Sequence, residues 1–193
     1  MTAAADPLPR LTFATMADWR AWLERNHTDS QGVWVQFAKR SSRIESVSYF
    51  EAVEVALCCG WIDSQAKSLD ENYYIQKFTP RKANSIWSQI NCVKALALIK
   101  RGRMLPAGHA AIKRAKENGR WKAAYHGPKK STVPPDLQAE LDKSPKAAAF
   151  FKTLSSQNRY AILFRLQTAK KAETRAARLA KFIGMLKRGE TLH

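Results

Sequence analysis

The sequence predicts an α+β fold, with a small antiparallel sheet packed with helices in the N-terminal part and an all-helical C-terminal part. Three short stretches before residue 80 alternate apolar and polar side chains, which is the period of a half-buried strand. Beyond Pro135 the apolar residues recur at helical spacing throughout. The chain has 193 residues, 45% of them hydrophobic, which is enough to bury a core.

Two helices with recognisable ends are expected in the first part. Thr15 and Asp18 have the spacing of a capping box, and this predicts a helix from residue 16 to about residue 27. Ser48 and Glu51 form a second capping box ahead of an apolar stripe, and Gly60 stands where a glycine ends a helix.

The strands are expected at 33–38, 61–66 and 73–79. The last two are separated by a turn-forming Leu-Asp-Glu-Asn tetrapeptide, so they form an antiparallel hairpin, and the first is its third member. Two more helices follow. Ser85 or Asn91 is the N-cap of one, and Pro106 occupies the first turn of the other.

The chain is expected to divide at a polar segment rich in Gly, Pro, Lys, Ser and Thr at 126–135. We therefore expect an α+β domain over 1–125, a linker over 126–135, and a helical domain over 136–193. Four amphipathic helices account for the last domain, the final one running from about residue 170 to 187.

Charge is very unevenly distributed. The formal net charge is +17; residues 1–80 hold 8 Lys and Arg against 10 Asp and Glu, whereas residues 81–193 hold 25 against 6. This asymmetry favours an anionic partner such as nucleic acid, a membrane surface or an acidic protein, although charge also serves solubility alone.

The candidate nucleic-acid contacts are the outward cations of the last helix: Lys171, Arg175, Arg178 and Lys181. The alternative is ordinary solvation of a surface helix. Since no aromatic base readers accompany these cations, any binding would be sequence-independent and salt-sensitive.

Several functional classes find no support in the sequence. It has no phosphate-binding glycine loop, no Gly-x-Ser-x-Gly and no His-Glu-x-x-His, so we assign no catalytic residue, metal or cofactor. Cys58, Cys59 and Cys92 lack metal-ligand spacing and are expected to be packed thiols. No segment is long and apolar enough to span a membrane and no secretory signal is evident, which predicts a cytoplasmic location.

The stretch from Gly60 to Asn91 interleaves large aromatics with single polar groups, which is typical of a ligand site. It is equally typical of a sheet covered by amphipathic aromatics. The candidate ligand-binding residues are Trp61, Asp63, Arg81, Ser85, Trp87, Ser88 and Asn91. Arg81 precedes an expected helix start, where an anion would be favoured; the alternative is a structural ion pair between Arg81 and Asp63.

Several motifs of this stretch and beyond resemble the YdeI/OmpD-associated, or bacteriocin-protection, family. They are Gly60-Trp61-Ile62-Asp63-Ser64, Phe78-Thr79-Pro80-Arg81, Gly102-x-Met104-x-Pro106-Ala107-Gly108, Gly119-Arg120-Trp121 and Ala169-Lys170-Lys171-x-Glu173-Thr174-Arg175. The resemblance implies tolerance of cationic antimicrobial peptides and association with an outer-membrane porin, and it brings no established reaction. A basic protein is a poor direct trap for cationic peptides because like charges repel.

The sequence therefore predicts a non-enzymatic cytoplasmic binding protein of this family, with an anionic partner and a role in stress or antimicrobial-peptide tolerance. The alternative is an enzyme or small-molecule sensor that uses a pocket around Asp63, Arg81 and Trp87.

Overall fold

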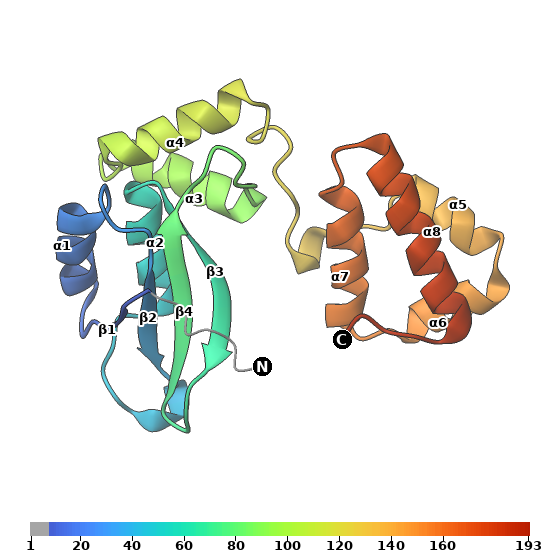
Figure 1. Cartoon of the computed structure of the whole chain (residues 1–193), viewed down its shortest axis with the longest axis horizontal. Coiled ribbons are helices and arrows are strands. Elements are labelled where there is room, and N and C mark those ends of the chain that lie inside the picture. Colours follow the sequence, from blue (N-terminus) through green and yellow to red (C-terminus); the bar gives the residue numbers. More distant parts are fainter. Residues whose placement is uncertain (1–7) are drawn as a thin grey trace. The chain divides into compact units, whose positions relative to one another are not determined.

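The computed structural model describes residues 8–193 and confirms the α+β class (Figure 1). The chain divides into two compact units. The first runs up to Trp87 and from Asn91 to Ala123; the second comprises Ser88–Ile90 and everything from Ala124 onward. The expected linker at 126–135 stays a prediction, and it contains a short 3-10 helix, η2 (Pro128–Lys130).

The first unit holds a four-stranded sheet in the order β1-β2-β4-β3. Its strands are β1 (Arg10–Thr12), β2 (Val33–Ala38), β3 (Trp61–Ser68) and β4 (Tyr73–Pro80). The expected hairpin and its third strand are confirmed, since β4 pairs antiparallel with both β3 and β2.

Strand β1 was not expected, and it makes the sheet mixed rather than purely antiparallel. It pairs in parallel with β2, and beside it the backbone N–H of Trp34 donates to the carbonyl of Pro9 at 2.8 Å. A strand of three residues is too short to show a period of two, and its partner lies far along the chain. Only the tertiary structure therefore defines it.

Four helices and one short 3-10 helix complete the elements that the structure describes between residues 8 and 123. They are α1 (Met16–Asn26), η1 (Arg40–Ser42), α2 (Tyr49–Cys58), α3 (Gln89–Lys100) and α4 (Pro106–Glu117). Both expected capping boxes are present, Thr15 with Asp18 and Ser48 with Glu51. Each satisfies backbone N–H groups that the first turn of a helix leaves without an intrahelical partner.

Helix α3 does not begin where the sequence suggested. The hydroxyl of Ser85 accepts from the backbone N–H of Lys82 at 3.0 Å, so Ser85 closes a turn instead of capping a helix. Asn91 already lies within the first turn of α3. The first residue of the helix is Gln89, whose N–H donates to the carbonyl of Tyr125 at 2.9 Å.

The core of the first unit lies between the sheet and helices α1 and α2; in the view of Figure 1, α2 lies behind the strands. Trp19 of α1 is fully buried, packs edge-on against Phe78 of β4, and donates its indole N–H to the carbonyl of Ala52 at 3.0 Å. This hydrogen bond satisfies the polar tip of a large apolar side chain. It also ties α1 to α2.

Helix α4 packs closely on the end of α2. A Cβ on Gly108 would collide with the sulfur of Met104 and with the carbonyl oxygen of Cys58, and it would lie 2.9 Å from the carbonyl of Leu57. The N–H of Leu105 donates to the same Cys58 carbonyl at 3.1 Å. Only glycine permits this approach. The contact fixes which face of α4 is buried.

The second unit contains α5 (Pro135–Asp142), α6 (Pro145–Thr153), α7 (Ser156–Gln167) and α8 (Ala172–Arg188). Ser144 and Ser155 cap α6 and α7 with their hydroxyls. The four helices enclose a core that includes Leu137, Phe151, Leu166 and Phe182. Within residues 8–193, no helix is both long and apolar enough to cross a bilayer.

Candidate functional site

Arg81 is buried in the first unit, and its contacts indicate a structural role. Its guanidinium carbon lies 3.7 Å from the ring centroid of Trp87, and its Nη1 donates to the carbonyl of Ile86 at 3.1 Å. Arg81 is 6% exposed and Trp87 is 2% exposed. A desolvated cation–π stack of this kind contributes about 2 kcal/mol. The side chain thus fastens the start of the 81–88 loop to its end.

The same loop is joined to the residues that follow α4. Arg120 Nη2 donates to Asn84 Oδ1 at 2.8 Å, and Asn118 Nδ2 donates to the carbonyl of Ala83 at 2.9 Å. Trp121 packs on Trp87 with ring centroids 4.8 Å apart. The loop is therefore a well-anchored connection, and its aromatic wall is an internal packing contact.

Asp63 belongs to a different network from Arg81. Its carboxylate accepts from the hydroxyl of Tyr49 at 2.8 Å and from Gln76 Nε2 at 3.5 Å. Gln76 also donates to the carbonyl of Ser64 at 3.1 Å. Within the described residues, these partners take the place of the Asp63–Arg81 ion pair that the sequence left open.

The other candidate ligand-binding residues are spread over several environments. Trp61 lies in the core, where its ring meets Trp22 edge-on at 6.1 Å and its N–H donates to the carbonyl of His27 at 3.1 Å. Ser85 closes the turn already described. Ser88 pairs with Tyr125 through a parallel β-bridge and groups with the second unit. Asn91 is half-buried in α3.

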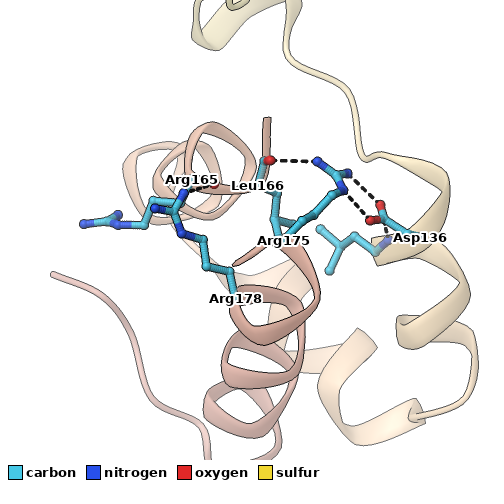
Figure 2. A network of polar contacts seen from close by, with 6 residues as sticks. Asp136, Arg165, Leu166, Arg175 and Arg178 are labelled. Atoms are coloured by element: carbon cyan, nitrogen blue, oxygen red, sulfur yellow. Dashed lines mark hydrogen bonds and ion pairs between the residues drawn. The ribbon is translucent and has the colours of Figure 1, made fainter. Parts of the chain in front are cut away.

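The arginines of α8 are used within the second unit (Figure 2). Arg175 makes a bidentate ion pair with Asp136 of α5, with Nε–Oδ2 at 2.6 Å and Nη2–Oδ1 at 2.8 Å, and its Nη1 donates to the carbonyl of Leu166 at 2.7 Å. Arg178 Nη1 donates to the carbonyl of Arg165 at 2.6 Å.

These bonds join three helices. Hydrogen bonds to the Arg175 guanidinium hold the pKa of Asp136 below its usual value. The acceptors at Leu166 and Arg165 are carbonyls in the last turn of α7, where a helix leaves its carbonyls without intrahelical partners and where positive charge is favoured. Two of the four cations proposed to contact nucleic acid therefore have intramolecular partners.

Lys171 and Lys181, the other two α8 candidates, are exposed. Lys171 precedes the helix as its N-cap residue, and Lys181 lies on its outer face. Their ammonium groups are available to solvent or to an anion. Of the four outward cations expected on the last helix, these two lysines therefore remain candidates for contact with an anion.

A surface hollow of about 290 Å³ in the second unit was not foreseen from the sequence. It is lined by His126, Ser131, Thr132, Val133, Pro134, Pro135, Leu163, Gln167 and Arg175. Arg175 enters it with its charge already balanced by Asp136. Residues of the 126–135 segment supply most of the lining, and their polar, aperiodic sequence carries no signal that could have indicated a hollow.

The three cysteines are free and buried. Burial raises the pKa of Cys59 to about 12 and that of Cys92 to about 11, with Arg81 opposing the second shift, so both thiols are protonated at neutral pH. Across residues 8–193, no group of three or more His, Cys, Asp or Glu side chains is placed to hold a metal ion.

The fold and the surface together define a basic, two-unit α+β protein. Residues 11–111, slightly more than half of the chain, match the family described as Domain of unknown function (DUF8412), and the chain belongs to that family. Residues 130–189 match the family described as Bacteriocin-protection, YdeI or OmpD-Associated, which confirms the resemblance noted from the sequence. No curated protein and no solved structure matches the chain.

Proposed function

We propose that this protein is a non-enzymatic cytoplasmic binding protein for an anionic partner, and that nucleic acid is the class of partner that its charge fits best. The observation that carries the proposal is the excess of cations after residue 80, where 25 Lys and Arg accompany 6 Asp and Glu. A surface with such an excess attracts polyanions through phosphate neutralisation, whatever their sequence.

Internal ion pairing supports this proposal because it consumes few of these cations. Four of the six carboxylates pair with cations of the same half: Glu117 with Lys113, Glu140 with Lys143, Asp136 with Arg175 and Glu190 with Arg188. One further cation of this half, Arg103, pairs with Glu54 of the first half. The remaining cations of this half greatly outnumber its other two carboxylates, Asp142 and Glu173. Most of the positive charge therefore stays available for an external partner.

The alternative of an enzyme or sensor pocket around Asp63, Arg81 and Trp87 receives less support. Asp63 binds Tyr49 and Gln76, while Arg81 stacks on Trp87 and binds a backbone carbonyl. A catalytic or ligand site needs its polar groups to converge on a space that a substrate can enter. We therefore assign no reaction to this cluster.

A role in stress or antimicrobial-peptide tolerance is part of the proposal, and it rests on the description of the family matched by residues 130–189. The formal net charge of +17 disfavours direct capture of cationic peptides. An indirect role, through an anionic partner in the cell, is consistent with that charge.

Retention of duplex DNA over a series of salt concentrations tests the proposal. We expect the full-length protein to bind duplex DNA at low salt with little sequence preference, and the logarithm of the affinity to fall linearly with the logarithm of the salt concentration. Absence of binding to duplex DNA of any sequence at about 20 mM salt would contradict it, because the Debye length is then well above 10 Å.

A further inference from the structure

We infer that the exposed face of helix α4 is the surface that contacts nucleic-acid phosphates. This inference rests on the proposed function and locates it on the structure, at residues that the sequence analysis did not single out.

The packing of α4 determines which side chains face solvent. Its inner face consists of Gly108, Ala111, Ile112 and Ala115, all buried. Because Gly108 lies directly on the carbonyls at the end of α2, the helix has no room to turn about its axis. The outer face is set by the same contact.

That outer face carries a basic stripe. His109, Lys113 and Lys116 are exposed and occupy positions i, i+4 and i+7, which lie one above another on a helix. They span about 10 Å along the axis, and duplex DNA carries one negative charge per ~1.7 Å of its own axis. The stripe is therefore long enough to meet more than one phosphate.

The segment that carries the stripe is poor in acids. Residues 100–122 include eight Lys and Arg and a single acid, Glu117, although one of these cations, Arg103, lies 3.6 Å from Glu54 of α2. Exposed Lys100 and Arg101 stand at the end of α3, exposed Arg114 lies on α4 itself, and exposed Lys122 follows it. Glu117 lies 4.0 Å from Lys113, and both side chains are more than half exposed, so this pair is weak and screened by salt.

A hollow of about 450 Å³ lies along the stripe. Its lining consists of the three stripe residues together with Ile99, Ala110, Ile112 and one carboxylate, that of Glu117. Lysine acts on a phosphate as a mobile point charge, so a shallow apolar floor edged by lysines accommodates a sugar-phosphate backbone without fixing its sequence. Lys116 also lies 5.7 Å from the ring centroid of Trp121, which restrains it at one end of the stripe.

Three charge-removal variants test the inference, each losing two exposed lysines. Lys113→Gln with Lys116→Gln removes the α4 stripe. Lys171→Gln with Lys181→Gln removes the rival surface at α8. Lys146→Gln with Lys152→Gln, on exposed positions of α6, is the matched control for net charge. All six side chains are exposed, so the urea midpoints of the variants should equal that of the parent protein.

We expect the salt slope for duplex DNA to fall by about 1.8 in the α4 variant, which is 0.9 for each lost phosphate contact, and to be unchanged in the other two. A parent protein that binds DNA while the α4 variant keeps its slope overturns the inference and leaves the proposed function standing. A parent protein that binds no DNA overturns both. Binding to vesicles containing phosphatidylserine in place of DNA would assign the surface to membranes, and would also overturn the inference.

Discussion

Helices α4 and α8 look alike in sequence and differ in what their cations do. Each is amphipathic, and each presents Lys and Arg opposite an apolar face. On α8, Arg175 and Arg178 donate to Asp136, Leu166 and Arg165, so the charge holds helices together. On α4, Lys113 and Lys116 are exposed, and the ion pair of Lys113 with Glu117 is long, at 4.0 Å, and open to solvent. Positive charge counted in a sequence is thus an upper limit on the charge that a partner can use.

The largest expected effect tests the rigid packing of α4. Gly108→Ala places a Cβ against the carbonyl oxygens of Leu57 and Cys58, so α4 must move away from α2. We expect a loss of about 3 kcal/mol in the free energy of unfolding, at the upper end for overpacking a tight core contact. Urea denaturation followed by tryptophan fluorescence measures it.

Gly184→Ala in α8 is the matched control for this change. Within residues 8–193, a Cβ there would meet the Nη1 of Arg188, at 3.4 Å, which is the end of a flexible side chain. Alanine has the higher helix propensity, so we expect a gain of up to about 1 kcal/mol. Equal effects of the two substitutions would mean that α4 is not held against α2 in the way described.

A smaller loss is expected for Arg175→Gln in α8. The substitution removes the bidentate pair with Asp136 and the bond to the Leu166 carbonyl, all at a partly exposed site. Hydrogen bonds to charged groups contribute about 1.5–3 kcal/mol, and exposure reduces the share that is lost, so we expect a loss of about 2 kcal/mol in unfolding free energy.

Lys171→Gln, four residues earlier and exposed, should change stability by less than about 0.5 kcal/mol. If Arg175→Gln is as harmless as Lys171→Gln, the α8 arginines are not structural, and the contrast with α4 disappears.

The elements with local signals could be predicted from the sequence. The hairpin strands, both capping boxes and the helices of the second unit follow from alternation, from Ser or Thr paired with an acid three residues on, and from apolar spacing. The start of α3 could not, because Ser85 and Asn91 both have N-cap chemistry and only tertiary contacts decide between a cap and a turn.

The candidate sites were less predictable than the fold. Arg175 and Asp136 are 39 residues apart, and nothing local indicates that they meet. Likewise Asp63 meets Tyr49 of α2 rather than Arg81, since β3 turns that carboxylate toward the helix. The basic face of α4 could have been noticed from the composition of residues 100–122, but its orientation depends on the packing of Gly108.

The difference between the two helices is tested most directly by the rate at which an acetylating reagent modifies individual lysines, with and without duplex DNA at low salt, followed by peptide mass spectrometry. A lysine that contacts phosphate reacts more slowly in the complex because its ammonium group is held and shielded. We expect Lys113 and Lys116 to be protected several-fold, and Lys171 and Lys181, which are also exposed in the free protein, to react at unchanged rates. Protection of the α8 pair with full reactivity of the α4 pair would contradict the account.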